Sequence, residues 1–270
     1  MTRSGPGEWR GLGLRVATAL VLAPPALAAL YFGSPYSDVL VLAAAGVAAW
    51  EWARMCRGGR LDPTGGLVVA AVTLAVAAGS LGDYLAAGWL AAAGAVAVTV
   101  MARRTGRSGA VWPGLGVVYL AAACLAFLWL RQDPTRGREL VFWLLAVVWS
   151  TDVGAYFAGR ALGGPKLAPS ISPNKTWAGL GGGMLAAAGV GVAAAAMRGD
   201  DYLRLVLLSI ALAVVAQVGD LFESRLKRRF GVKDSSALIP GHGGVLDRID
   251  GILAGALVFG GGIWLTGTAR

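Results

Sequence analysis

The most regular pattern along the chain is a series of long apolar stretches separated by short polar connections. A helix needs about 20 apolar residues to cross the hydrocarbon core of a bilayer. Each stretch that approaches or meets this length therefore predicts one membrane-spanning helix. There are nine of them, covering residues 14–32, 36–53, 65–81, 84–102, 111–130, 139–158, 177–197, 202–222 and 248–266.

Two parts of this pattern allow another interpretation. The third and fourth stretches are joined only by a short turn near Asp83, so the count there is open. The first stretch follows three arginines and is rich in alanine, which also fits a cleaved signal peptide. Eight further stretches follow it, however, and Pro24–Pro25 suits a kinked membrane helix. We predict an all-α polytopic membrane protein with about nine transmembrane helices.

Composition agrees with this fold class. The 270 residues are 56% hydrophobic and only 14% charged, whereas soluble domains carry nearer a quarter of charged residues. The mean hydropathy is +0.64. Many of the 41 glycines lie inside the apolar stretches, where small residues let membrane helices approach closely.

Basic residues are unevenly distributed between the two sides of the predicted membrane. With nine helices, the N-terminus and the connections 54–60, 103–107, 159–176 and 223–248 share one side and hold 18 of the 24 Lys and Arg. The positive-inside rule places that side in the cytoplasm. Basic loops facing anionic membrane lipids also explain the net charge of +9. No nucleic-acid-binding motif is present, so we expect no nucleic acid partner.

Acidic residues divide the chain into two parts. Residues 1–135 hold five nearly uniform apolar helices, and Glu51, between Trp50 and Trp52, is interpreted there as an interfacial anchor. Residues 136–270 hold acids at cytoplasmic helix ends, and acids inside a membrane are usually functional. We predict a membrane half at 1–135 and a catalytic membrane domain at 136–270. Its site lies at the cytoplasmic ends of the last four helices, with loops 159–176 and 223–248.

Two of these acids, Asp220 and Asp247, predict a metal site. They lie at the ends of adjacent predicted helices. Mg²⁺ binds a few carboxylates together with phosphate oxygens and water, so we expect Mg²⁺ there, with Mn²⁺ as an alternative. Asp152 and Glu223 are further candidate ligands on the same side.

The segment 224–250 groups cations, carboxylates, His242 and glycines between two apolar helices. Cations suit phosphate groups, and glycines let backbone approach them closely. A loop that only binds lipid headgroups explains Lys227, Arg228 and Arg229, but not the paired acids or the Gly-rich turn. His242 by itself fits a structural residue as well as a phosphate contact.

The loop 159–176 offers a second candidate anion site. Its Ser172-Pro-Asn-Lys-Thr176 run leads into a predicted helix, where free N–H groups and Lys175 suit an anion. A plain capped turn fits this run equally well. The GxxxxGK[ST] phosphate loop is absent.

The residues from Ser224 to Asp250, SRLKRRFGVKDSSALIPGHGGVLDRID, resemble the signature of the phosphatidate cytidylyltransferases, also called CDP-diacylglycerol synthases. The Ser-Pro-Asn-Lys-Thr-Trp loop, Ser150-Thr-Asp152 and Gln217-Val-Gly-Asp220 resemble other motifs of that family. The resemblance is close over about residues 145–255. The first half resembles the family only as a variable set of spans.

The resemblance implies transfer of the cytidylyl group from CTP to phosphatidate, giving CDP-diacylglycerol and pyrophosphate. It also implies a homodimer and a second, monovalent cation such as K⁺, to which Asp152 or Glu223 contributes. We predict catalytic roles for Asp220, Asp247, Lys233, Asp234, His242 and Arg248. We predict contacts to the substrate phosphates from Ser172, Asn174, Lys175, Thr176, Ser224, Lys227, Arg228, Gly243 and Gly244.

Three alternative functions fit some of these features. A CDP-alcohol phosphotransferase would carry a DGxxAR run, which is absent. A CTP-dependent lipid or polyprenol kinase shares the membrane architecture, but the HGGxxDRxD match disfavours it. An ion-coupled transporter would place its acids near the bilayer midplane. A short chain rich in Ala, Gly and Arg suggests the plasma membrane of a bacterium.

Overall fold

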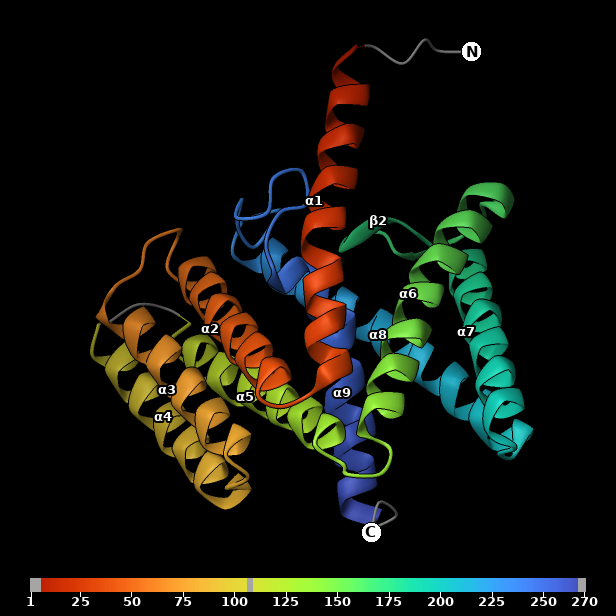
Figure 1. The fold of residues 1–270 in the computed structure, drawn as a ribbon. Helices are drawn as coiled ribbons and strands as arrows, with labels where there is room; N and C mark the ends of the chain where they lie inside the picture. Colours follow the sequence, from red (N-terminus) through yellow and green to blue (C-terminus); the bar gives the residue numbers. More distant parts are fainter. Residues whose placement is uncertain (1–5, 106–108, 267–270) are drawn as a thin grey trace. The chain divides into compact units, whose positions relative to one another are not determined.

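The fold is known from a computed structural model that describes residues 6–105 and 109–266 (Figure 1). Within these residues it contains helices at the positions of all nine predicted spans. Their bounds are α1 Pro6–Phe32, α2 Tyr36–Cys56, α3 Pro63–Ser80, α4 Tyr84–Arg104, α5 Val111–Arg131, α6 Gly137–Leu162, α7 Trp177–Arg198, α8 Tyr202–Arg229 and α9 Leu246–Thr266. The turn at Asp83 separates two helices, α3 and α4, and the Asp83 carboxylate caps α4 by accepting the Ala86 N–H at 2.9 Å.

Among the residues that the structure describes, seven helices, α2 to α8, are long and apolar enough to cross a membrane. Large apolar side chains point outward from them: Trp89 is 70% exposed and Leu185 76% exposed. Water would make such exposure costly, whereas lipid chains solvate these side chains well. The protein is an all-α polytopic membrane protein, as predicted.

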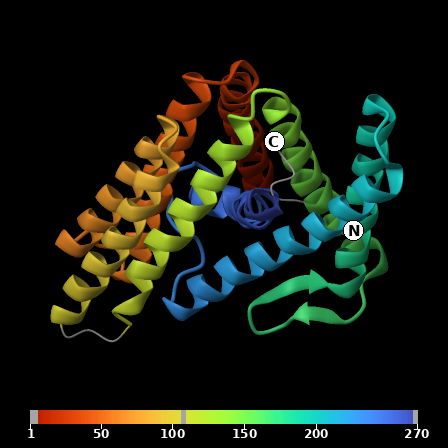
Figure 2. The same ribbon diagram turned by 90° about the horizontal axis from the view of Figure 1, so that it is seen from below.

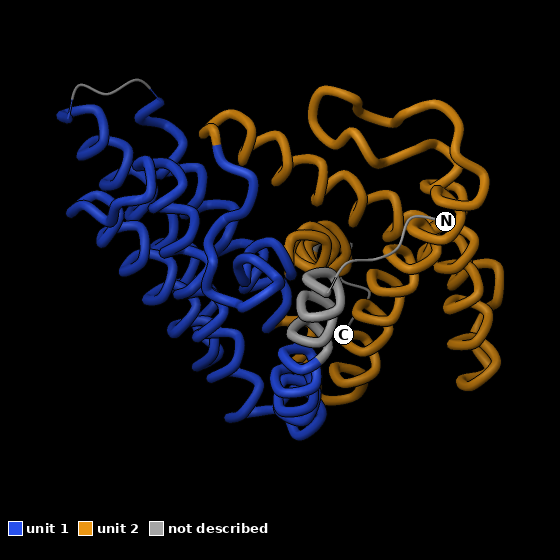
Figure 3. The backbone as a smooth tube through the Cα atoms, turned by 90° about the horizontal axis from the view of Figure 1, so that it is seen from above, with its two compact units in different colours: residues 1–128, 232–248 blue, residues 129–231, 249–270 orange. Residues whose placement is uncertain are grey.

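The chain forms two compact units (Figure 3). The first contains residues 1–128 and 232–248, and the second contains residues 129–231 and 249–270. The segment that carries most of the predicted chemistry is therefore shared between them. The predicted boundary at residue 135 separates a membrane half from a catalytic domain, whereas the two units are defined by packing. The boundary therefore stays a prediction.

In the first unit, α2, α3, α4 and α5 lie side by side (Figures 1 and 2). The indole of Trp52 is buried, and its Nε1 donates to the carbonyl of Trp112 at 3.0 Å. Gly116 makes room for this ring, because a Cβ there would lie 2.1 Å from the indole nitrogen. Glycine and alanine at such contacts allow the close helix packing expected in a membrane.

In the second unit, glycines bring α6 and α7 together. A Cβ at Gly154 would lie 2.6 Å from the carbonyl oxygen of Gly182, and one at Gly183 would lie 2.9 Å from that of Thr151. The glycine-rich start of α7 is thus used for packing within the chain. On the α7–α8 contact, a Cβ at Gly191 would lie 2.8 Å from the carbonyl oxygen of Leu205.

Between α6 and α7 the chain forms a β-hairpin (Figure 2). Strand β1, Lys166–Ala168, pairs antiparallel with β2, Ser172–Thr176. The sequence predicted only a loop here, and the structure adds that the loop contains two short paired strands. The strands are only three and five residues long, and β2 contains Pro173, which is tolerated on an edge strand.

Helix α8 continues to Arg229, beyond the predicted end at residue 222. The loop predicted over 223–248 is therefore shorter, and Ser224, Lys227 and Arg228 lie on a helix. Glu223 and Lys227 form an i,i+4 ion pair, and three basic residues in the last turn suit the helix dipole. These interactions explain why the polar run stays helical.

Candidate active site

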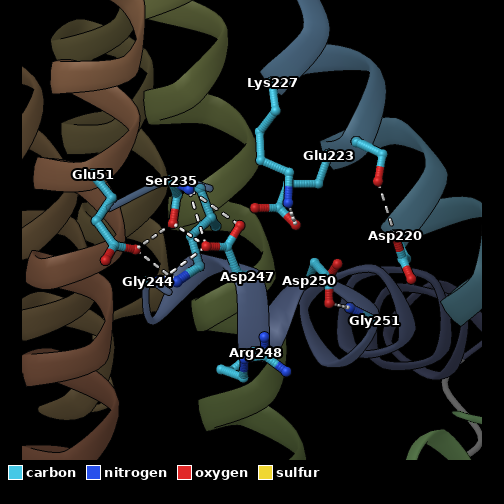
Figure 4. A network of polar contacts seen from close by, with 12 residues as sticks. Glu51, Asp220, Glu223, Lys227, Ser235, Gly244, Asp247, Arg248, Asp250 and Gly251 are labelled. Carbon is cyan, nitrogen blue, oxygen red and sulfur yellow. Dashed lines mark hydrogen bonds and ion pairs between the residues drawn. The ribbon is translucent and has the colours of Figure 1, made fainter. Parts of the chain in front are cut away.

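In the first unit, the loop before α9 is fastened to α2 through Glu51. The Glu51 side chain is fully buried. Its carboxylate accepts the backbone N–H of Val245 at 2.9 Å and that of Leu246 at 2.7 Å. The hydroxyls of Ser236, at 2.6 Å, and Ser235, at 3.2 Å, donate to it as well. Figure 4 shows this carboxylate facing Ser235 and Gly244.

Asp247, in the first turn of α9, is the second carboxylate bound by this loop. Its Oδ2 accepts the N–H of Gly244 at 2.8 Å and the N–H of Ser235 at 2.9 Å. The Ser235 hydroxyl lies 3.0 Å from the same oxygen. This resembles a capping box, in which an acidic side chain in the first turn of a helix accepts backbone N–H groups that precede the helix. We call Glu51, Asp247 and the residues bound to them the loop cluster.

Two glycines bring the backbone close to these carboxylates. A Cβ on Gly244 would lie 2.0 Å from the Ser235 hydroxyl oxygen and 2.5 Å from Glu51 Oε1. Gly243 has a φ of +83°, which favours glycine, and a Cβ there would lie 2.8 Å from Asp247 Oδ2. The space that the glycines provide is thus occupied by the protein's own acids. The predicted contacts of both residues to phosphate stay predictions.

The turn 239–243 is closed by its own hydrogen bonds. Ile239 N–H donates to the Gly243 carbonyl at 2.8 Å, and His242 N–H donates to the Ile239 carbonyl at 2.9 Å. Arg248 donates from Nε and Nη2 to the His242 carbonyl, at 2.9 and 2.7 Å. Arg248 therefore holds this turn, and the structure shows a backbone role for it. The predicted residues Lys233 and Asp234 are exposed.

A cavity of about 370 Å³ lies beside the loop cluster in the same unit. Its walls are the end of α2 with Gly59, together with Val232 and residues 235–238, which include Ser235 and Ser236. Arg54 lies over the Trp50 ring, 4.6 Å from its centroid, and its Nε donates to the Gly59 carbonyl at 2.8 Å. Ligand pockets have volumes of roughly 300–1,000 Å³. The serines bonded to Glu51 therefore border a space of ligand size.

In the second unit, Asp220 lies in another group of polar residues. We call this group, which consists of Lys175, Asp220, Glu223, Ser224 and Lys227, the α8 cluster. Lys175, from β2, places its Nζ 2.6 Å from Asp220 Oδ2. Ser224, one turn further along α8, donates to Asp220 Oδ1 at 3.2 Å. The hairpin thus brings a predicted cation to a predicted acid. Neighbouring Glu223 is buried, and its Oε2 lies 3.4 Å from Lys227 Nζ.

Other predicted residues of this unit lie around the cluster. Asp152 on α6 is exposed, and its Oδ1 lies 3.4 Å from Nε2 of Gln217 on α8. Thr176 is buried and caps α7, since its hydroxyl accepts the Gly179 N–H at 3.0 Å. Ser172 is half-buried on β2, while Asn174 and Arg228 are exposed. Phosphate contacts from these residues stay predictions.

Comparison with known proteins shows the family of this chain. The sequence model of the cytidylyltransferase family matches residues 13–262. The chain belongs to the cytidylyltransferase family. A phosphatidate cytidylyltransferase of Brucella suis is 40% identical over 251 residues, which are 91% of this chain and 90% of that protein. Proteins of the same name are 38% identical in Pseudomonas aeruginosa, over 94% of this chain and 97% of theirs, and 34% identical in Haemophilus influenzae, over 91% and 96%.

The predicted metal site of this cytidylyltransferase consists of Asp220 and Asp247. Within residues 6–105 and 109–266, no group of three or more His, Cys, Asp or Glu side chains is arranged to hold a metal ion. The predicted pair, Asp220 and Asp247, belongs to two different units, so its assembly stays a prediction. The carboxylate oxygens themselves suit Mg²⁺, which completes its coordination with phosphate and water; here Lys175 and Ser224 contact Asp220, and the N–H groups of Gly244 and Ser235 contact Asp247.

The prediction that Glu51 of this cytidylyltransferase is an interfacial anchor was wrong. Glu51 is fully buried and bonded to the loop before α9, residues 230–245, which we call the signature loop, rather than anchored at the membrane interface. One signal was available in the sequence, since an acid inside an apolar helix is costly and is usually functional. The flanking Trp50 and Trp52 pointed to the interface instead. The partners of Glu51 lie 184 to 195 residues further along the chain.

Proposed function

We propose that this membrane enzyme transfers the cytidylyl group of CTP to phosphatidate. An oxygen of the phosphatidate phosphate attacks the α-phosphorus of CTP, the bond to the β-phosphate breaks, and CDP-diacylglycerol and pyrophosphate leave. The observation that carries this proposal is the family match over residues 13–262. Relatives named phosphatidate cytidylyltransferase support it, because they align along more than 90% of this chain.

Phosphoryl chemistry of this kind depends mainly on positioning and charge neutralisation. We assign Asp220 and Asp247 as carboxylate ligands of Mg²⁺, which when bound neutralises CTP phosphates. The cations Lys175, Lys227, Arg228 and Lys233 are placed to meet the remaining phosphate charge. Asp152 or Glu223 contributes to a second cation such as K⁺.

The enzyme acts in the plasma membrane of a bacterium, with its active site facing the cytoplasm and as a homodimer. The side that holds 18 of the 24 Lys and Arg carries the signature loop, and CTP is available in the cytoplasm. The glycine-rich start of α7 packs within its own chain. Support for the dimer therefore rests on the family resemblance alone.

Activity is tested directly with purified protein in detergent. CTP labelled at the α-phosphate, phosphatidate and Mg²⁺ should give labelled CDP-diacylglycerol and an equal amount of pyrophosphate. A parallel reaction with CTP labelled at the γ-phosphate should leave the lipid unlabelled. Transfer of the γ-label to lipid would instead show a kinase, and the absence of both products would contradict the proposed function.

The metal assignment predicts a large loss of turnover in Asp220→Ala and in Asp247→Ala. Each removes a carboxylate that would hold the Mg²⁺ whose charge offsets the CTP phosphates, so we expect kcat to fall by roughly 100-fold or more at saturating Mg²⁺. The measurement is initial rate at matched amounts of folded protein. Asp200→Asn, in the connection between α7 and α8, serves as the control and should keep its rate. Normal turnover in either alanine variant would contradict the assignment.

A further inference from the structure

We propose that Glu51 is a positioning residue for cytidylyl transfer, which sets the place of Asp247 through the loop between them. This inference rests on the proposed function and on the assignment of Asp247. Glu51 itself belongs to α2, far from the signature in sequence, and acts on the reaction only through the loop cluster. All of the contacts that carry the proposal lie within the first unit.

The first step is the hold of Glu51 on the start of α9. The first N–H groups of a helix have no partners within that helix. Glu51 accepts two N–H groups at this point, those of Val245 and Leu246, at 2.9 and 2.7 Å. A carboxylate near a helix N-terminus is also favoured by the helix dipole. Glu51 therefore caps α9 from another helix and fixes where its first turn, with Asp247, begins.

The second step is the shared hydroxyl of Ser235. Its oxygen lies 3.2 Å from Glu51 Oε2 and 3.0 Å from Asp247 Oδ2. Because a hydroxyl has a single proton, Ser235 donates it to one carboxylate at a time, and its oxygen lies between the two acids. The Ser235 N–H also donates to Asp247 Oδ2 at 2.9 Å. A displacement of Glu51 therefore moves the group that orients Asp247 (Figure 4).

The third step is the position of the loop against the cavity. Ser235 and Ser236 both donate to Glu51 and both line the 370 Å³ cavity. Gly244 completes the fit, because a Cβ there would collide with both Ser235 and Glu51. The carboxylate thus holds the cavity wall and the start of α9 together.

The test is Glu51→Gln in the full-length protein. The amide keeps the volume of the side chain but replaces one acceptor by an NH₂ group, which would face the donors on the loop. Loss of a residue that orients a metal ligand typically costs 10–100-fold in activity or affinity. We expect kcat to fall by about that factor, and Mg²⁺-dependent CTP binding, measured by calorimetry without phosphatidate, to weaken similarly. The midpoint of thermal unfolding should fall as well, because the NH₂ group leaves buried loop donors without an acceptor, so kcat and CTP binding are the readouts that decide.

Asp38→Asn is the matched control, because Asp38 is a buried acid at the other end of α2. It should keep both kcat and CTP affinity. A Glu51→Gln protein with a lower unfolding temperature but normal kcat and CTP affinity would show a purely structural role and overturn the proposal.

If Glu51→Gln does not fold, Ser235→Ala decides, since it removes the linking hydroxyl and leaves the backbone bonds to Glu51. A folded Ser235→Ala protein with reduced kcat and weaker CTP binding supports the proposal, and wild-type values overturn it. Wild-type protein that makes no CDP-diacylglycerol would instead refute the proposed function. An active wild type with an equally active Glu51→Gln refutes the positioning role alone.

Discussion

At the scale of single residues, the signature loop is organised around two carboxylates that bind mostly backbone and hydroxyl donors. Glu51 takes two N–H groups and two serines, and Asp247 takes the N–H groups of Gly244 and Ser235. Buried acids are costly unless their oxygens are hydrogen-bonded. The loop supplies those bonds and in return acquires a fixed shape. Its glycines are required because the acids occupy the space that side chains would fill.

Gly244→Ala is expected to disturb this arrangement more than most glycine substitutions. The added Cβ would meet Ser235 and Glu51 below contact distance, and overpacking of this kind costs about 1–3 kcal/mol. We expect a lower unfolding temperature in detergent together with a lower rate. Gly181→Ala on α7 is the matched control, because nothing lies within 4 Å of its added Cβ. Equal stability of the two variants would contradict the observed packing.

At the scale of elements, the sequence predicted helices well and their polar ends poorly. The bounds of α2 to α7 and of α9 agreed within about four residues, because bilayer thickness fixes the length of an apolar stretch, whereas α1 begins earlier and α8 ends later than predicted. The extra turns of α8 were missed because a charged run was interpreted as loop, although Glu223 and Lys227 pair along the helix. The hairpin was missed because its strands are too short to show alternation. Glu51 was misjudged because its partners are distant in sequence, and apolar periodicity contains no information about such pairs.

The hairpin gives a prediction at this scale. Thr176 ends β2 and caps α7 through the Gly179 N–H, and loss of such a cap costs about 0.5–2 kcal/mol. Thr176→Ala should lower the free energy of unfolding by about 1 kcal/mol, measured in denaturant or by heating. Thr176→Ser keeps the hydroxyl and should retain most of the stability. Equal losses in both variants would show that the hydroxyl does not act as the cap.

At the scale of the whole molecule, the charge distribution predicts orientation in the membrane. Arg60 lies between α2 and α3, and Arg136 lies between α5 and α6. Both arginines are exposed, and the positive-inside rule predicts that Arg60 faces the cytoplasm and Arg136 the opposite side.

Single cysteines test this orientation in a background with Cys56→Ala and Cys124→Ala. In intact bacterial cells whose outer surface is accessible, a membrane-impermeant maleimide should label Arg136→Cys and leave Arg60→Cys unlabelled. Permeabilised cells should label both, which controls for reactivity. Labelling of Arg60→Cys alone in intact cells would reverse the predicted orientation and place the signature loop outside.

The hydrogen bonds between Glu51 and the signature loop limit how this enzyme can be divided into fragments or combined with other proteins in chimeras. The segment with the catalytic motifs is continuous in sequence, so a fragment from residue 136 onward would carry every predicted catalytic residue. It would nevertheless leave behind the acid of α2 that caps α9. Exchange of the first half for helices from another protein would meet the same requirement. A working chimera must bring its own acid to this point, so the two halves are not interchangeable modules.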